Sequence, residues 1–127
     1  MREIKIRYRI RSKNFPKVID TDIVTLEQIE KGYISDVYKG CEILSRDLLT
    51  GFGDKNAKEI YEGDIVHGYW YDKSRIATII FENGSFWIKG SDMIGNTEGF
   101  QFLLGSMYGG IEVIGNIYEN PELLKEV

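Results

Sequence analysis

Apolar and polar side chains alternate along the first part of the chain. In the run IKIRYRIR at residues 4–11, three isoleucines and a tyrosine alternate with one lysine and three arginines. A period of two predicts a half-buried β-strand with one apolar face and one basic face. Residues 18–24 alternate less cleanly, and we interpret them as a second strand. The pattern therefore predicts a β-rich N-terminal region.

A short helix is predicted after this second strand. Thr25 and Gln28 have the spacing of a capping box, in which each residue satisfies a free amide of the other. Leu26 and Ile29 then share one helical face, and Gly32 supplies a stop signal. We therefore expect a helix at about residues 25–31.

The middle of the chain is less decisive. The run CEILSRDLL at residues 41–49 fits a strand or a helix, and we favour a strand. The following run, TGFGDKNAK at residues 50–58, combines two glycines with Asp54 and Asn56. That composition predicts a turn-rich loop.

From residue 60 the pattern predicts a β-meander. Asn83-Gly84 is a strong hairpin signal, because both residues tolerate the positive φ of a type I′ turn. Asn120, Pro121 and Glu122 predict the start of a short C-terminal helix. The expected strands of the meander, interrupted by a polar loop at 90–99, are residues 65–71, 75–82, 85–89, 100–104 and 111–116.

Short strands joined by tight turns indicate a small barrel or sandwich. Gly63-Asp64 at the entrance of the meander resembles the turn pattern of an SH3-like barrel. We predict an all-β fold with a minor α contribution. An N-terminal β-rich subdomain with short helices would span residues 1–41, and a small SH3-like β-barrel would span residues 42–127.

Composition restricts the environment of the protein. No run approaches the ~20 apolar residues of a membrane helix, and the N-terminus lacks the apolar core of a signal peptide. Cys41 is the single cysteine, so no internal disulfide can form. We expect a cytoplasmic protein without a membrane partner.

Charge is distributed unevenly. Residues 1–17 hold seven basic residues and one acidic residue, a sum of +6, so the total of -4 leaves -10 for the rest. The basic face of the first strand consists of Lys5, Arg7, Arg9 and Arg11, spaced about 7 Å apart. These residues are candidates for binding nucleic-acid phosphates. Two structural alternatives are protection of an edge strand and pairing with the acidic body of a neighbouring subunit.

Aromatic residues gather in the meander. Tyr69, Trp70 and Trp87 are candidate binding residues, because exposed rings beside cations can stack on bases. The alternative is packing in the core or in a subunit contact. The pattern leaves open whether Val66, Gly68 and Trp70 face inward, or instead Ile65, His67, Tyr69 and Tyr71.

No catalytic or metal-binding pattern stands out. Cys41 and His67 occur once each, which leaves only a formal Cys–His pair. The motifs of phosphate-binding loops are missing from the sequence. An acidic cluster could hold a hard cation, but we favour turn capping for its members, Asp54, Glu59, Glu62 and Asp64. We expect no catalytic residue, no metal site and no cofactor.

Three segments carry a family resemblance. They are residues 1–5 (MREIK), residues 50–66 (TGFGDKNAKEIYEGDIV) and residues 111–124 (IEVIGNIYENPELL). Together they resemble the YopX family of phage and prophage proteins. The usual family loop is closer to TGLKDKNGKEIYEGD, so Phe52, Gly53 and Ala57 depart from it here. The resemblance implies the fold class and a phage origin, and it supplies no catalytic residues.

These observations rank three functional hypotheses. The first is a non-enzymatic phage accessory protein that binds a host or phage protein and forms homo-oligomers. The second is a nucleic-acid-binding module that uses the basic strand. The third is an uncharacterised enzyme, for which the sequence shows no catalytic group.

Overall fold

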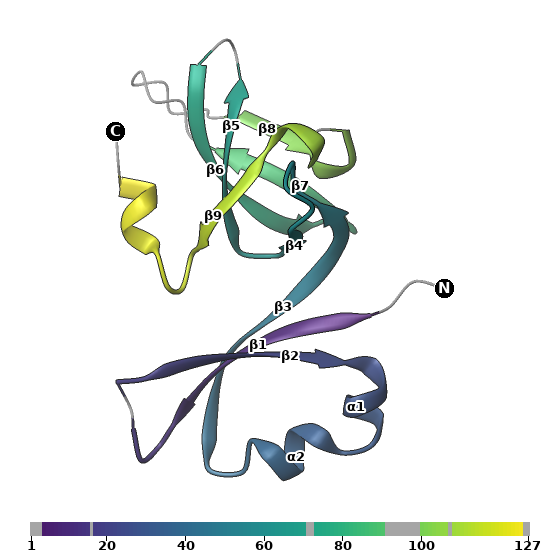
Figure 1. The fold of residues 1–127 in the computed structure, drawn as a ribbon, viewed down its shortest axis with the longest axis vertical. Helices are drawn as coiled ribbons and strands as arrows, with labels where there is room; N and C mark the ends of the chain where they lie inside the picture. Colours follow the sequence, from purple (N-terminus) through teal and green to yellow (C-terminus); the bar gives the residue numbers. More distant parts are fainter. Residues whose placement is uncertain (1–3, 16, 71–72, 91–99, 107, 126–127) are drawn as a thin grey trace. The chain divides into compact units, whose positions relative to one another are not determined.

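Antiparallel strands make up most of the structure, a computed structural model that describes residues 4–15, 17–70, 73–90, 100–106 and 108–125. The helices are few and short (Figure 1). The predicted fold class, mostly β with a minor α contribution, is therefore confirmed. The chain divides into two units, unit 1 (Met1–Leu49) and unit 2 (Thr50–Val127).

Unit 1 is a small sheet covered by two helices. Its strands are β1 (Lys5–Ser12), β2 (Ile19–Thr25) and the first part of β3 (Cys41–Gly53), and β1 lies between the other two. Both pairings of β1 are antiparallel. The helices α1 (Leu26–Glu30) and α2 (Tyr33–Val37) follow β2 (Figure 1). Because β1 is a central strand, its cations do not protect a sheet edge.

The predicted capping box begins α1. The Thr25 hydroxyl accepts from the Gln28 amide at 3.3 Å, and the Thr25 amide donates to the Gln28 side chain at 2.9 Å. Gly32, with φ +81°, ends α1 as predicted. The sequence analysis missed α2, which starts directly after this glycine. A helix of five residues offers too few turns for a periodic pattern to stand out.

The core of unit 1 lies between the sheet and the helices. Tyr8, Val24 and Tyr38 are buried there, and the rings of Tyr8 and Tyr38 lie 5.5 Å apart. Partly buried neighbours include Ile6 and Ile10, which follow the predicted apolar parity of β1. The apolar face of this strand is therefore confirmed.

Unit 2 is built from the end of β3 and a five-stranded meander. The meander has the order β8-β7-β6-β5-β9. In the described ranges, no pairing between β8 and β9 closes this sheet, so the SH3-like barrel remains a prediction. The short strand β4 (Glu59–Tyr61) precedes the meander. The strands of the meander are β5 (Asp64–Trp70), β6 (Lys73–Glu82), β7 (Ser85–Gly90), β8 (Phe100–Leu103) and β9 (Glu112–Asn116).

Turns connect these strands largely as expected. Asn83 and Gly84 both have positive φ, 52° and 78°, and join β6 to β7. The predicted C-terminal helix forms as the 3-10 helix η3 (Pro121–Lys125), after η1 (Leu104–Ser106) and η2 (Tyr108–Gly110). Except for Gly90, which ends β7, the predicted polar loop at 90–99 lies outside the described residues.

The unit boundary follows from strand pairing. Residues 41–48 of β3 pair with β1, so they belong to unit 1. The second unit therefore starts at Thr50, whereas the sequence analysis divided the chain between residues 41 and 42. Strand β3 is long enough to serve both units, a property that a local pattern does not reveal.

The core of unit 2 settles which side of β5 faces inward. Val66 and Trp70 are buried in the main cluster, together with the core residues Ile60, Ala77, Ile79, Ile88, Leu104 and Ile111. On the opposite parity, exposure increases along the strand from buried Ile65 to Tyr69, which is 72% exposed. The parity of Val66, Gly68 and Trp70 therefore faces the core. Tyr71 lies outside the described residues.

Candidate interaction surfaces

Arg7 and Arg9 are buried, in contrast to the exposed basic face predicted for β1. The Arg7 guanidinium donates to the Asp47 carboxylate at 2.9 Å. Arg9 is only 1% exposed, lies 3.6 Å from the same carboxylate and donates to the Thr21 hydroxyl at 2.9 Å. Burying cations is costly unless they are paired, which explains the carboxylate on the neighbouring strand. The expectation that these two side chains project toward a ligand is wrong.

The remaining members of the predicted basic face, Lys5 and Arg11, differ in exposure. Arg11 forms an ion pair with Glu42 at 2.6 Å, and both side chains remain partly exposed. Lys5 is half-buried at the start of β1. The basic face therefore divides into a buried part, Arg7 and Arg9, which links neighbouring strands, and a partly exposed end, where Arg11 is paired with Glu42.

A second polar network supports the helical side of unit 1. The Asp22 carboxylate on β2 accepts from the hydroxyls of Tyr33 and Tyr38, at 2.8 and 2.7 Å. The hydrogen bond to Asp22 raises the pKa of Tyr33, whereas burial first and Asp22 second raise the pKa of Tyr38. Both hydroxyls therefore stay protonated as donors at neutral pH. The network ties the short α2 region to the sheet.

The aromatic candidates in unit 2 lie in different environments. Trp70 is 4% exposed and belongs to the core, so the expectation that it is a surface binding residue is wrong. Gly68 makes room for its ring, because a Cβ at this position would lie 2.8 Å from Trp70. Tyr69 is exposed and packs edge-on against His67, with ring centroids 5.4 Å apart.

Trp87 is half-buried on β7. Its indole Nε1 donates to the backbone carbonyl of Glu82 at 2.9 Å, across the β6–β7 hairpin. This bond fixes the ring beside the Asn83-Gly84 turn. Of the three aromatic candidates, Tyr69 and Trp87 therefore keep surface that a partner can contact.

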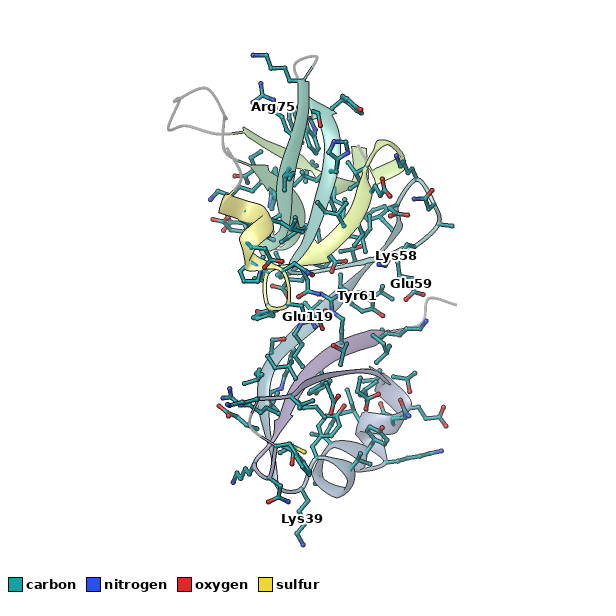
Figure 2. The ribbon with its side chains drawn as sticks, turned by 60° about the vertical axis from the view of Figure 1, so that its left-hand side comes forward. Lys39, Lys58, Glu59, Tyr61, Arg75 and Glu119 are labelled. Carbon is teal, nitrogen blue, oxygen red and sulfur yellow. The ribbon has the colours of Figure 1, made fainter. Side chains whose placement is uncertain are left out.

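The conspicuous loop at residues 54–58 is organised by one carboxylate. Asp54 accepts from the backbone amides of Asn56, Lys58 and Val113, at 2.8, 2.9 and 2.9 Å. Burial by itself would raise the pKa of Asp54, but these donors outweigh it and hold the pKa below its usual value. Figure 2 shows Lys58 and Glu59 at the end of this loop. The predicted capping role of Asp54 is confirmed.

Two further polar residues of the same motifs also bind backbone. The Asp64 carboxylate accepts from the Tyr61 amide at 2.8 Å and closes the tight turn that contains Gly63. The Asn116 side chain accepts from the amides of Tyr118 and Glu119, at 3.1 and 2.8 Å. The two long motifs of the sequence are therefore explained as turn-forming elements of unit 2.

The formal catalytic candidates have ordinary surroundings. Cys41 packs beside the core of unit 1. In unit 2, His67 is hydrogen-bonded to the Ser74 hydroxyl on the neighbouring strand. Across the ranges that the structure describes, no group of three or more His, Cys, Asp and Glu residues is placed to hold a metal ion. None of the helices in these ranges is long and apolar enough to cross a bilayer.

An apolar hollow opens on unit 2 between the end of β3 and strands β7 and β8. Its volume is about 430 Å³, and Ser85 contributes the polar group of its lining. Phe81, which is 44% exposed, lies near it with its ring 4.9 Å from that of Phe86. The lining residues are Phe52, Ser85, Phe86, Leu103 and Gly105. This apolar hollow has the size and character of a small binding site.

The tip of the β1–β2 hairpin is a second exposed apolar feature, located in unit 1. Phe15 is 68% exposed and Val18 is 53% exposed. Lys13 and Lys17, both exposed, flank Phe15 in the sequence. Backbone hydrogen bonds from Phe15 to Ser12 and from Val18 to Phe15 hold the turn. We call Lys13, Phe15, Lys17 and Val18 the hairpin tip.

Sequence reasoning missed both of these surfaces. The apolar hollow combines Phe52 with Leu103, which are far apart along the chain, so no local pattern marks it. The hairpin tip carried a usable signal: Phe15 stands among mostly polar residues between the two predicted strands, where a large ring has no core to enter.

A family model agrees with the sequence resemblance. The family model described as YopX protein matches residues 7–125. No curated protein matches the chain. Among solved structures, the chain is similar to protein EF1440 from Enterococcus faecalis, with a TM-score of 0.46 and 25% identity. That match covers 92% of this chain and 74% of the other. Because the family model spans nearly the whole sequence, the chain belongs to the YopX family.

Proposed function

We propose that this protein is a phage or prophage accessory protein that acts without catalysis, as a protein-interaction module that forms homo-oligomers. The observation that carries the proposal is the apolar hollow, with exposed Leu103 in its lining and exposed Phe81 nearby. Exposed apolar surface that is grouped in this way is typical of interaction sites. A cytoplasmic location in a bacterial host fits the single cysteine.

The departures from the usual family loop add support. Phe52 takes the place of a leucine and Gly53 that of a lysine, and Phe52 lines the apolar hollow. The first change adds aromatic surface, and the second removes a positive charge next to it. Both changes favour a partner that brings an apolar side chain to this part of unit 2.

The SH3-like barrel is also part of the proposal. Ile60 on β4 belongs to the same core cluster as Val66 and Ile79, and Phe52 at the end of β3 packs against that cluster. The hairpin of β3 and β4 therefore contributes to the same core as the five-stranded sheet. This arrangement supports a small, partly open barrel in which short strands from both sheets surround one core.

Nucleic-acid binding is the first alternative. Arg7 and Arg9 are buried in ion pairs with Asp47, so the site would depend on the exposed cations Lys13, Lys17 and Arg46. An informative variant therefore changes Lys13 and Lys17 to glutamate and leaves the buried arginines intact. Salt-sensitive binding of labelled oligonucleotides that this variant loses would favour the alternative.

An enzyme is the second alternative. The observation that would support it is the hydrogen bond between His67 and Ser74, because a histidine can activate a hydroxyl nucleophile. Neither residue lines the apolar hollow. Labelling of Ser74 by a fluorophosphonate probe, abolished by His67→Ala, would favour an enzyme.

Sedimentation equilibrium tests the leading proposal. The chain has a mass of 14.6 kDa, so the proposal predicts a larger average mass that rises with protein concentration. A mass of one chain at every concentration, up to the millimolar range, would contradict homo-oligomer formation.

A further inference from the structure

The hairpin tip of unit 1 exposes a large aromatic side chain on a defined turn. Phe15 is 68% exposed, although burial of such an apolar side chain is favourable. The turn that carries it is held by backbone hydrogen bonds of 3.1 and 3.2 Å. A defined turn with an exposed ring has already lost part of the conformational entropy that binding would otherwise remove.

The charges of the hairpin tip differ from those of the neighbouring strand. Arg7 and Arg9 share the Asp47 carboxylate, and Arg11 pairs with Glu42, so all three have partners within unit 1. Lys13 and Lys17 are exposed on either side of Phe15. The hairpin tip therefore presents an aromatic ring between two positive charges.

The apolar hollow of unit 2 has complementary properties. Its aromatic lining and its volume of about 430 Å³ accommodate one inserted ring. Glu82 is the register partner of Ser85, which belongs to the lining, and is exposed next to it. Unit 2 holds six basic and twelve acidic residues, a net charge of -6, whereas unit 1 holds ten basic and eight acidic residues, a net charge of +2.

We propose that the hairpin tip of one copy of this chain inserts Phe15 into the apolar hollow of a second copy, with Lys13 and Lys17 facing the exposed Glu82 next to the hollow. This inference rests on the proposed self-association and names the two surfaces that carry it. The contact is heterologous, so each copy offers one hairpin tip and one hollow. Repetition of such a contact makes a ring or an open chain.

Charge favours this arrangement over a symmetric one. Two hairpin tips facing each other would bring Lys13 and Lys17 against their own copies. Two hollows facing each other would bring acidic units together. Like charges across an interface suppress association, and opposite charges support it. A crossed contact between hairpin tip and hollow is the combination in which the charges attract.

Two single variants and their mixture test the proposal. Phe15→Ser removes the ring of the hairpin tip, and Leu103→Glu places a charge in the hollow. We expect each to lower the association constant by about tenfold or more. Val37→Ser is the matched control, because it removes an apolar side chain of unit 1 that is 52% exposed and belongs to neither the hairpin tip nor the hollow. Circular dichroism and thermal melting identify any variant that fails to fold.

The decisive step is mixing the two variants. The Leu103→Glu chain keeps a hairpin tip and the Phe15→Ser chain keeps a hollow, so a one-to-one heterodimer should form and stop there. A second test reverses charges. Lys17→Glu and Glu82→Lys should each weaken association, and a chain that carries both substitutions should regain it.

Each other outcome overturns the inference in its own way. Variants that associate like the wild type would show that the hairpin tip and the hollow do not form the contact, while the proposed self-association would still hold. Variants that are monomeric alone and in mixture would exclude the crossed contact. A wild type that is monomeric at all concentrations would overturn this inference and the proposed function together. If Leu103→Glu does not fold, Glu82→Lys replaces it in the mixture.

Discussion

The buried carboxylates Asp47 of unit 1 and Asp54 of unit 2 bind different kinds of groups. In unit 1, charged groups pair with each other across strands, as in the contact of Arg7 and Arg9 with Asp47. In unit 2, carboxylates bind backbone amides, as Asp54 does at three positions. The difference teaches that a row of charges along a strand need not be a ligand surface. In both units the conspicuous polar residues are used internally, while apolar side chains such as Phe15 and Phe81 remain exposed.

Removal of the Asp47 carboxylate should have the largest effect on stability, because two buried arginines share it. Asp47→Asn removes a counter-charge that the buried Arg7 and Arg9 share, and we expect a loss of about 3–5 kcal/mol in the free energy of unfolding. Glu42→Gln is the control, because its pair with Arg11 is partly exposed and worth about 1 kcal/mol or less. Urea denaturation measures both. Equal losses would show that burial does not distinguish the two pairs.

The core of unit 2 should respond to added volume. Gly68→Ala places a Cβ about 2.8 Å from the Trp70 ring and 3.1 Å from Ile111. We expect a loss of about 1–3 kcal/mol from overpacking. Gly109→Ala is the control, since a Cβ there meets nothing within 4 Å. A neutral result at Gly68 in thermal unfolding would mean that the Trp70 ring moves freely.

The capping carboxylate of unit 2 predicts a pH dependence. The folded-state pKa of Asp54 is lowered, so its contribution is complete above the unfolded value of about 3.9 and disappears as the pH falls through the folded value. Asp54→Asn should cost about 1–2 kcal/mol at pH 7. The difference in the free energy of unfolding between this variant and the wild type should shrink below about pH 3.9. A difference that stays constant down to acid denaturation would contradict the capping role.

The smallest effect expected is a gain in stability. Ala57 has φ +63°, a conformation that costs a side chain about 1 kcal/mol relative to glycine. Ala57→Gly should therefore raise the free energy of unfolding by about 0.5–1 kcal/mol. Ala77→Gly is the same change in the core strand β6 and should lower it. If Ala57→Gly and Ala77→Gly lowered the free energy of unfolding by similar amounts, Ala57 would not be strained.

Local signals predict local structure in this chain. The capping box of Thr25 and Gln28 and the Asn83-Gly84 turn depend on residues that are close in sequence, and both form as predicted. The pairing of Arg7 with Asp47 joins residues 40 positions apart, and alternation alone cannot reveal it. Alternation marks a polar face of a strand without telling whether a neighbouring strand supplies the counter-charge.

The same distinction between local and long-range information applies to the candidate sites. The sequence makes Trp70 a surface candidate because adjacent aromatic residues must face both ways, and the pattern alone cannot choose the parity. The structure buries Trp70 and exposes Tyr69, since Gly68 leaves space for the larger ring on the core side. The apolar hollow needs three-dimensional information, because its walls come from β3, β7 and the β8 region.

Arginine footprinting tests most directly whether the charges of β1 are internal. Phenylglyoxal modifies accessible guanidinium groups, and peptide mass spectrometry locates them. The account predicts that Arg7 and Arg9 resist modification in the folded protein, that exposed Arg46 reacts, and that urea makes all three reactive. Modification of Arg7 and Arg9 at the rate of Arg46 would contradict the account and restore β1 as a candidate ligand-binding strand.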